Sequence, residues 1–186
     1  MTDVLGDLAD RHNLTDIRRT SARGLRERYL YSPDMRYRYA FARWWDSPDL
    51  GGLTAWILLN PATGDTEQRY RPTLERCIDW SHRWQSTGLV ILNLFAYRAT
   101  DPRALRVAED PIGPDTDDVL TSVTDGCART IAAWGANGRL RGRSAAVGAL
   151  LREPWCLGVT QHGEPRHPLY VNAAAERIRW EPPDRS

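Results

Sequence analysis

The sequence predicts a single α/β domain over residues 1–186, built as a three-layer α/β/α sandwich around a central, mainly parallel four-stranded sheet. Strand and helix patterns alternate four times after residue 52, which is typical of parallel strands joined by crossover helices. The expected strands are nearly continuous apolar runs, as found where helices cover both faces of a sheet. A chain of 186 residues can also bury a core without metal or disulfide support.

The N-terminal part is expected to carry a β-hairpin in addition to this sheet, either against a ligand or as an extension of the sheet. Residues 1–24 are polar and weakly periodic, which indicates a short helix or a loose arm before an α/β domain over 25–180. Aromatic residues alternate over 28–31 and 37–41, on either side of a Ser-Pro-Asp turn, and this pattern predicts a β-hairpin. Residues 181–186 are expected to form a frayed tail.

Four buried strands and the helices between them follow from the hydrophobic pattern. The strands are expected at residues 53–59, 88–92, 130–134 and 155–159. Helices are expected over 71–84, after Pro114, over 144–152 and over 173–180. Thr73 is expected to cap the first of these helices with its hydroxyl group. Acidic residues directly after Pro114 suit a helix N-terminus, where the helix dipole is positive.

Composition excludes several classes of protein. The 25 basic residues are all arginine, so there is no lysine for Schiff-base chemistry or for a Walker phosphate loop. The net charge of +1 is not that of a strongly basic duplex-DNA binder. No apolar run reaches the roughly 18 residues of a membrane span. The acidic N-terminus also differs from a signal peptide, so we expect a cytoplasmic protein with no membrane partner.

The metal-binding residue types are scattered rather than clustered. Cys77, Cys127 and Cys156 form no CxxC pair and lie in apolar segments, which favours buried, reduced thiols. No group of His, Cys, Asp and Glu has the spacing of a metal site. We therefore expect neither a metal nor another cofactor.

Four polar motifs, each directly after an expected strand, indicate one functional site. They occupy residues 60–65, 93–98, 134–138 and 162–170. Ligands of open α/β sheets bind in the crevice outside the carboxyl ends of the strands, where these motifs would meet. The catalytic candidates are Asn60, Asp65 and His167. The candidates for substrate binding are Pro61, Thr63, Asn93, Phe95, Tyr97, Arg98, Trp134, Gly135, Arg166 and Tyr170.

The first motif places Asn60 directly before a proline, which holds the preceding residue in an extended conformation at the strand end. Thr63 and Asp65 add a hydroxyl group and a carboxylate. Such a loop can orient a water molecule or grip a small polar ligand. An ordinary capped turn accounts for the same residue types.

The second motif carries groups suited to a nucleobase. The carboxamide of Asn93 both donates and accepts hydrogen bonds, so it can read the edge of a base. Phe95 or Tyr97 can stack on a planar ring. The alternative is structural: Phe95 packs in the core, and Arg98 pairs with Asp101.

The third and fourth motifs offer backbone donors and a histidine. His167 lies between Arg166 and Pro168 in a loop, where neither a helix pattern nor a strand pattern requires it. A histidine can donate to a developing negative charge or transfer a proton near neutral pH. The glycines of the third motif, Gly135 and Gly138, can let backbone N–H groups cup a phosphate.

Taken together, the motifs resemble those of an uncharacterised bacterial family known as domain of unknown function 1643. The shared pattern is Leu-Asn-Pro-Ala-Thr, Asn-Leu-Phe-Ala-Tyr-Arg-Ala-Thr-Asp-Pro, Trp-Gly and Pro-Arg-His-Pro-Leu-Tyr, within residues 28–172. The chain departs from the family at Arg71, where the resemblance implies an aspartate before Pro-Thr. The family itself implies no reaction.

The order of the motifs is also similar to that of the uracil-DNA glycosylase superfamily, whose fold is a four-stranded parallel α/β/α sandwich. The resemblance implies that Asn60 orients the attacking water, Asn93 reads the base and His167 stabilises the anionic leaving base. The chain has His-Pro-Leu-Tyr where the glycosylases continue with His-Pro-Ser. The likeness therefore does not extend to the loop that enters duplex DNA.

Three functions are compatible with these residues. The first is an N-glycosidase that acts on a nucleobase in nucleic acid or in a nucleotide, a reaction that needs a placed water and one good donor. The second is a non-catalytic module that binds a nucleotide or nucleic acid on the same fold. The third is a different hydrolase or transferase that uses the same crevice. The sequence sets no oligomeric state.

Overall fold

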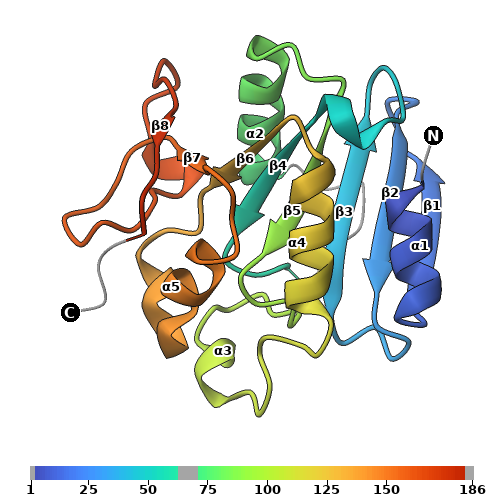
Figure 1. The fold of residues 1–186 in the computed structure, drawn as a ribbon, viewed down its shortest axis with the longest axis horizontal. Helices are drawn as coiled ribbons and strands as arrows, with labels where there is room; N and C mark the ends of the chain where they lie inside the picture. Colours follow the sequence, from blue (N-terminus) through green and yellow to red (C-terminus); the bar gives the residue numbers. More distant parts are fainter. Residues whose placement is uncertain (1–2, 63–70, 183–186) are drawn as a thin grey trace.

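The computed structural model describes residues 3–62 and 71–182, and it has an eight-stranded mixed sheet with helices on both faces (Figure 1). The strand order is β1-β2-β3-β5-β4-β6-β7-β8. The strands are β1 (Thr15–Thr20), β2 (Arg26–Tyr31), β3 (Arg38–Trp44), β4 (Leu53–Leu58), β5 (Gly88–Asn93), β6 (Arg129–Ala132), β7 (Trp155–Cys156) and β8 (Ile178–Arg179). The α-helices are α1 (Val4–Arg11), α2 (Pro72–Arg83), α3 (Ala104–Val107), α4 (Thr116–Gly126) and α5 (Arg143–Gly148). Short 3-10 helices are η1 (Leu50–Gly52), η2 (Ala136–Gly142) and η3 (Pro168–Tyr170).

The centre of the sheet is parallel and its flanks are antiparallel. β4 pairs in parallel with β5 and β6, and β7 joins β6 in parallel through Ile131 and Trp155. On one side β3 runs antiparallel to β5, and on the other β8 runs antiparallel to β7. The predicted α/β class is confirmed. The sheet has eight strands, whereas four strands and an N-terminal hairpin were expected, because the hairpin and further antiparallel strands extend the parallel centre at both edges.

The N-terminal hairpin forms as its aromatic alternation predicts. β2 and β3 are antiparallel, with Tyr29 opposite Phe41. β1 then pairs with β2, so residues 15–20 form an edge strand that the sequence did not predict. The sequence of β1 is Thr-Asp-Ile-Arg-Arg-Thr, which contains no apolar run to indicate a strand. This composition fits its position, because the strand is half-buried to exposed. Before it, α1 is the short helix that was one of the two expectations for residues 1–24.

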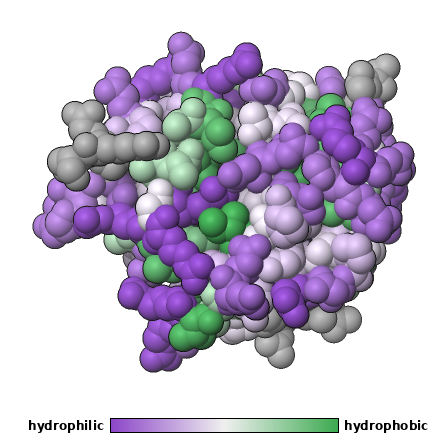
Figure 2. Space-filling view, turned by 60° about the horizontal axis from the view of Figure 1, so that its bottom comes forward, coloured by the Kyte–Doolittle hydropathy of each residue, from purple (hydrophilic) through white to green (hydrophobic). Residues whose placement is uncertain are grey.

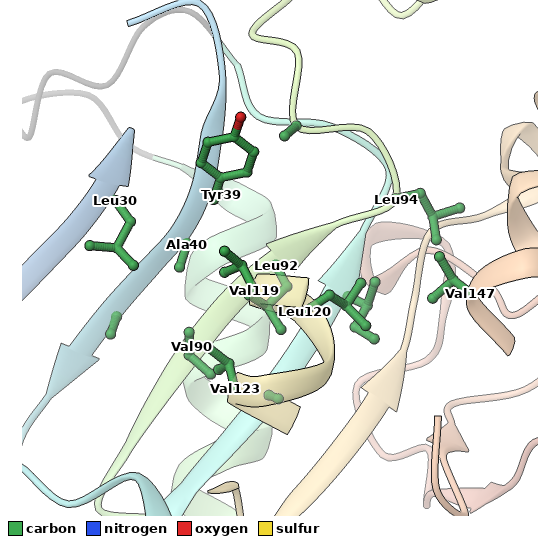
Figure 3. Packing of buried hydrophobic residues seen from close by; sticks show 14 of the residues in the cluster. Leu30, Tyr39, Ala40, Val90, Leu92, Leu94, Val119, Leu120, Val123 and Val147 are labelled. Carbon is green, nitrogen blue, oxygen red and sulfur yellow. The ribbon is translucent and has the colours of Figure 1, made fainter. Parts of the chain in front are cut away.

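Alternate residues of β5 point into two separate cores. Val90 and Leu92 pack on one face with α4, whose Val119, Leu120 and Val123 lie over them (Figure 3). The leucines of α1 and Val147 of α5 join the same core.

Leu89 and Ile91 of β5 point to the opposite face of the sheet, where Trp56 of the neighbouring strand β4 joins them in a second core. Cys77 and Ile78 of α2 pack over this core. Period-two alternation in the strand thus matches helix cover on both sides. The layers are α1, α4 and α5, then the sheet, then α2.

The start of α2 corrects one predicted detail. Pro72 is the first helical residue, and Arg71 occupies the N-cap position, where its side chain makes no cap hydrogen bond with the described residues. Proline is favoured at the first helical position because its missing N–H would be unpaired there anyway. Thr73 therefore lies inside the helix and is not its cap. α4 follows Pro114 as expected, whereas α5 ends at Gly148 and is shorter than predicted.

The C-terminal segment also differs from the prediction. The expected helix over 173–180 is absent from the described chain, which has turns there and then β8. Arg177 and Arg179 both lie against the ring of Trp155, at 5.1 and 4.0 Å from its centroid. Residues two apart share a face in a strand but not in a helix, so these contacts favour extended backbone. β7 itself spans two residues, fewer than the expected 155–159.

Two general expectations can be compared with the described chain. None of its helices has the length and apolar character needed to cross a membrane. All three cysteines are free thiols, and burial raises the pKa of each. For Cys127 burial raises the pKa to about 12.

Candidate functional site

A cavity of about 790 Å³ lies at the carboxyl ends of the parallel strands. This volume is within the range of small-molecule sites. All four motifs contribute to its wall through Asn60, Asn93, Trp134, Gly135, Arg166, His167 and Tyr170. Figure 2, which turns the lower side of Figure 1 toward the viewer, shows a mainly hydrophilic surface with small apolar patches. A second cavity, of about 550 Å³, lies between α1 and the edge formed by β1–β3, and no predicted site residue lines it.

Asn93 is the last residue of β5 and lines the cavity with a side chain that is only 3 % exposed. Neither its amide oxygen nor its amide nitrogen has a hydrogen-bond partner among the described residues. Backbone bonds hold the strand end in place, because Leu94 N donates to Leu58 O at 2.9 Å. Leaving a buried polar group unpaired costs about 1–3 kcal/mol. The arrangement therefore suits a ligand that offers an acceptor and a donor side by side.

The amide nitrogen of Asn60 is hydrogen-bonded, whereas its amide oxygen is available to a ligand. Its Nδ2 donates to Ala99 O at 2.8 Å and to Pro61 O at 3.2 Å. Because only the nitrogen can donate to a carbonyl, these bonds fix which way the amide is turned. Its Oδ1 accepts no hydrogen bond within the described part of the chain. Asn60 thus presents a rigid acceptor at the cavity.

His167 presents the complementary group, a donor. Its Nδ1 accepts a hydrogen bond from the backbone N–H of Leu169 at 3.3 Å. Burial lowers the pKa of His167 below the usual 6.5, which favours the neutral ring near pH 7. In the neutral ring with Nδ1 as acceptor, the proton is on Nε2. The ring of Tyr170 lies beside it, with centroids 5.7 Å apart.

Two contacts hold the third and fourth motifs together. Gly135 N donates to Pro165 O at 2.9 Å, and a Cβ added at Gly135 would lie 3.3 Å from Cβ of His167. The φ of Gly135 is +75°, a conformation that other residues rarely adopt. The buried Nε1 of Trp134 donates to the carboxyl group of Glu164 at 2.9 Å. The third and fourth motifs are therefore joined on either side of Gly135, and Glu164 is a residue that sequence reasoning missed although it lies inside the fourth motif.

The charge of the described wall is positive. Arg38, Arg71 and Arg166 line the cavity, and no Asp or Glu does so among its described lining residues. Arg38 is only 6 % exposed, so its charge is held in a region of low solvent access. A cavity wall of one sign attracts ligands of the opposite sign. Sequence reasoning missed Arg38 and Arg71 as site residues. For Arg71, the departure from the family pattern at this position was the signal that could have indicated a role in the site.

Comparison with known proteins assigns the family. A family model described as "Protein of unknown function (DUF1643)" matches residues 38–169. The chain belongs to this family. The matched span runs from Arg38 to Leu169 and includes Asn60, Asn93 and His167. No curated protein and no solved structure matches the chain.

Several predicted residues lie away from the cavity in this DUF1643 protein. Phe95 is completely buried in the core, which was the alternative expectation for it. Tyr97 packs edge-on against Tyr37, with centroids 6.1 Å apart. Arg98 donates to Met35 O at 2.8 Å. Arg98 makes no ion pair with Asp101 in the described chain, because Asp101 is bound by Arg103 at 2.8 Å.

The remaining predictions for the DUF1643 chain concern the first motif and metals. Pro61 is buried beside Asn60 but is not part of the cavity wall. Thr63 and Asp65 lie outside the described residues. Among the residues that the structure does describe, no group of three or more His, Cys, Asp and Glu side chains could hold a metal ion.

Proposed function

We propose that the cavity binds a nucleobase and that the protein is an N-glycosidase acting on a nucleobase in nucleic acid or in a nucleotide. The observation that carries this proposal is Asn93, whose two amide atoms are buried at the cavity with no described partner. A carboxamide pairs naturally with the edge of a base, where a donor and an acceptor are adjacent. The cost of leaving both atoms unpaired is relieved when such an edge is bound.

The other open groups suit hydrolysis of the bond between base and sugar. A water that donates to Oδ1 of Asn60 attacks the anomeric carbon, and a C–O bond forms as the C–N bond breaks. The electron pair of the C–N bond stays on the base, and the proton of the water passes to solvent. Nε2–H of His167 donates to the anionic base. Preorganised donors at developing charge typically contribute about 10²–10³ in rate.

The arrangement of the central strands supports this reading. β5, β4, β6 and β7 are parallel neighbours, and the four motifs leave their carboxyl ends. The order of the motifs along the chain is similar to that of the uracil-DNA glycosylase superfamily, and the proposal draws on that resemblance. Tyr170 stands in η3 where those enzymes carry another sequence, and it is 78 % exposed at the rim. The proposal therefore specifies a base and a glycosidic bond, without a requirement for duplex DNA.

The test is release of free base. The purified protein is incubated with uracil-containing and modified single- and double-stranded DNA, RNA and free nucleotides, and released bases are detected by mass spectrometry. We expect wild-type protein to release one base, and Asn60→Ala and His167→Ala each to reduce the rate by about 10²-fold or more. His162→Ala is the control, because this histidine is exposed and does not line the cavity. Unchanged rates in both site variants would exclude the mechanism.

One observation favours a second candidate, binding without turnover. The described wall of the cavity has no carboxylate to accept a proton from water. Reading of a base by Asn93 requires no such group. Ligand binding that Asn93→Ala abolishes, without base release from any substrate, would establish the binding module in place of the enzyme.

A further inference from the structure

The N-terminus of α2 opens on the same cavity. Pro72, Thr73 and Leu74, the first residues of this 12-residue helix, all line it. Arg71, in the N-cap position, makes no side-chain cap hydrogen bond, and no other described side chain binds the first backbone N–H groups of the helix. Uncapped N–H groups and the positive end of the helix dipole together favour an anion.

Two arginines line the same cavity as this helix end. Arg71 directly precedes Pro72, and Arg38 reaches the cavity from the start of β3. Arg38 is more than nine-tenths buried, which keeps its attraction for an anion from being screened by solvent. The one acidic residue in the first turn, Glu75, does not line the cavity and pairs with Arg23 at 3.4 Å.

The unpaired amide of Asn93 is an independent sign that this cavity receives a ligand. It is neutral and suits a base, whereas Arg38, Arg71 and the helix end suit a negative charge. A ligand that satisfies both has a nucleobase at one end and an anionic group at the other. The volume of about 790 Å³ exceeds what a free base fills and is in the range that accepts a larger ligand.

We propose that the N-terminus of α2, with Arg38 and Arg71, is a phosphate subsite, so that the ligand is a nucleotide phosphate rather than a nucleoside or a free base. Guanidinium groups match phosphate oxygens through paired hydrogen bonds, and backbone N–H groups at a helix end add further donors. The base half of this assignment rests on the proposed function. The assignment of the phosphate subsite is argued from the helix end and the arginines, and phosphate binding is measured in a separate experiment.

The first experiment titrates inorganic phosphate into the protein by isothermal calorimetry at low ionic strength. Arg71→Gln removes one cationic donor, and we expect the affinity to fall about tenfold or more. Thr73→Glu adds a carboxylate at the helix end and should abolish binding. A glutamate in the first turn stabilises a helix, so this variant is expected to remain folded. Arg152→Gln is the matched control, because the side chain of Arg152 is exposed and does not line the cavity.

The second experiment compares a nucleoside with its 5′-monophosphate and with a short single-stranded oligonucleotide. We expect both phosphorylated ligands to bind at least tenfold more tightly than the nucleoside, with the difference lost in Arg71→Gln. A preference for the monophosphate identifies a free nucleotide as the source of the phosphate, and a preference for the oligonucleotide identifies a polynucleotide.

The two proposals fail in different ways. Phosphate binding that Arg71→Gln and Thr73→Glu leave unchanged, or no phosphate binding at all, would overturn the subsite. Equal affinity for nucleoside and nucleotide, both lost in Asn93→Ala, would also overturn it while leaving the nucleobase site intact. Phosphate binding that depends on Arg71, with nucleotides no tighter than phosphate, would keep the subsite and remove the nucleobase function.

Discussion

Asn93, Asn60 and His167 differ in how much of their hydrogen-bonding capacity the protein itself uses. Nδ2 of Asn60 and Nδ1 of His167 are bound by the backbone, whereas Asn93 has neither amide atom paired within the described residues. The first two side chains are thereby oriented, and each leaves one group for a ligand. Asn93 leaves both. The set of one acceptor, one donor and one donor–acceptor pair defines what a ligand must offer in return.

The unpaired amide leads to a prediction about stability. Asn93→Leu replaces both buried polar atoms with an apolar side chain of similar size, so it removes a cost of about 1–3 kcal/mol per unpaired group. We expect the free energy of unfolding in urea to stay equal or to rise, while nucleotide binding is lost. A loss of stability as large as that of a core truncation would show that Asn93 has a structural role instead.

Trp134 and Glu164 provide a second prediction. Trp134→Phe removes the hydrogen bond to the buried carboxyl group of Glu164, and we expect a loss of about 1.5–3 kcal/mol in the free energy of unfolding. Trp134→Phe/Glu164→Met removes both partners and should recover part of this loss. Additive losses in the double-mutant cycle would contradict a coupled pair.

The lowered pKa of His167 sets the sign of a pH effect. As the pH falls through 6.5, the unfolded chain binds a proton at this residue before the folded protein does. The contribution of His167 to stability is thus complete above 6.5 and declines toward its lower folded pKa. We expect wild-type protein to lose more unfolding free energy than His167→Gln between neutral and mildly acidic pH. Denaturant unfolding at a series of pH values measures this difference, and parallel curves would contradict it.

At the scale of elements, the success of sequence reasoning depended on whether a strand is buried on both faces. β4 and β5 begin as predicted and end within one residue of the prediction, because their continuous apolar runs reflect burial directly. β1 and β8 are largely exposed edge strands, which are defined by pairing with a neighbour rather than by their own residue types. Such strands have no strong local pattern to find.

The same contrast applies to the candidate site. Asn60, Asn93 and His167 could be placed from the sequence because each lies at or after the end of an expected strand, and parallel strands end at one edge. Arg38 could not, because it begins a strand. It reaches the cavity only because β3 runs antiparallel to β5, which brings the start of one strand beside the end of the other. That pairing is a property of the folded sheet.

The loop after β6 allows a prediction about close approach. Gly135→Ala places a methyl group 3.3 Å from Cβ of His167, in a backbone conformation that costs about 1–3 kcal/mol for a residue other than glycine. We expect lower stability together with weaker ligand binding. Gly142→Ala is the control, since Gly142 also has a positive φ but an added Cβ meets nothing within 4 Å. Equal effects of both variants on binding would show that displacement of His167 is unimportant.

At the scale of the molecule, one buried arginine joins the N-terminal elements to the sheet. Arg28 of β2 binds Asp16 of β1 through two hydrogen bonds of 2.8 Å and also binds Asp3, the N-cap of α1. We expect Arg28→Met to leave both carboxylates without their main partner and to open α1 and β1 locally. Amide hydrogen exchange should become faster over residues 4–20 and stay slow in β4. Uniformly faster exchange would indicate global destabilisation instead.

The sheet order has a consequence for where this protein can be cut. The family match covers residues 38–169, yet β2 supplies Leu30 to one core and Tyr29 to the other, and it precedes that span. Beyond the span, Trp180 packs perpendicular to Trp134 and donates to Gly163 O at 3.0 Å. A fragment trimmed to the matched residues would expose the edge of β3 and remove the brace behind Trp134. The unit that folds is therefore longer at both ends than the unit that the family model recognises.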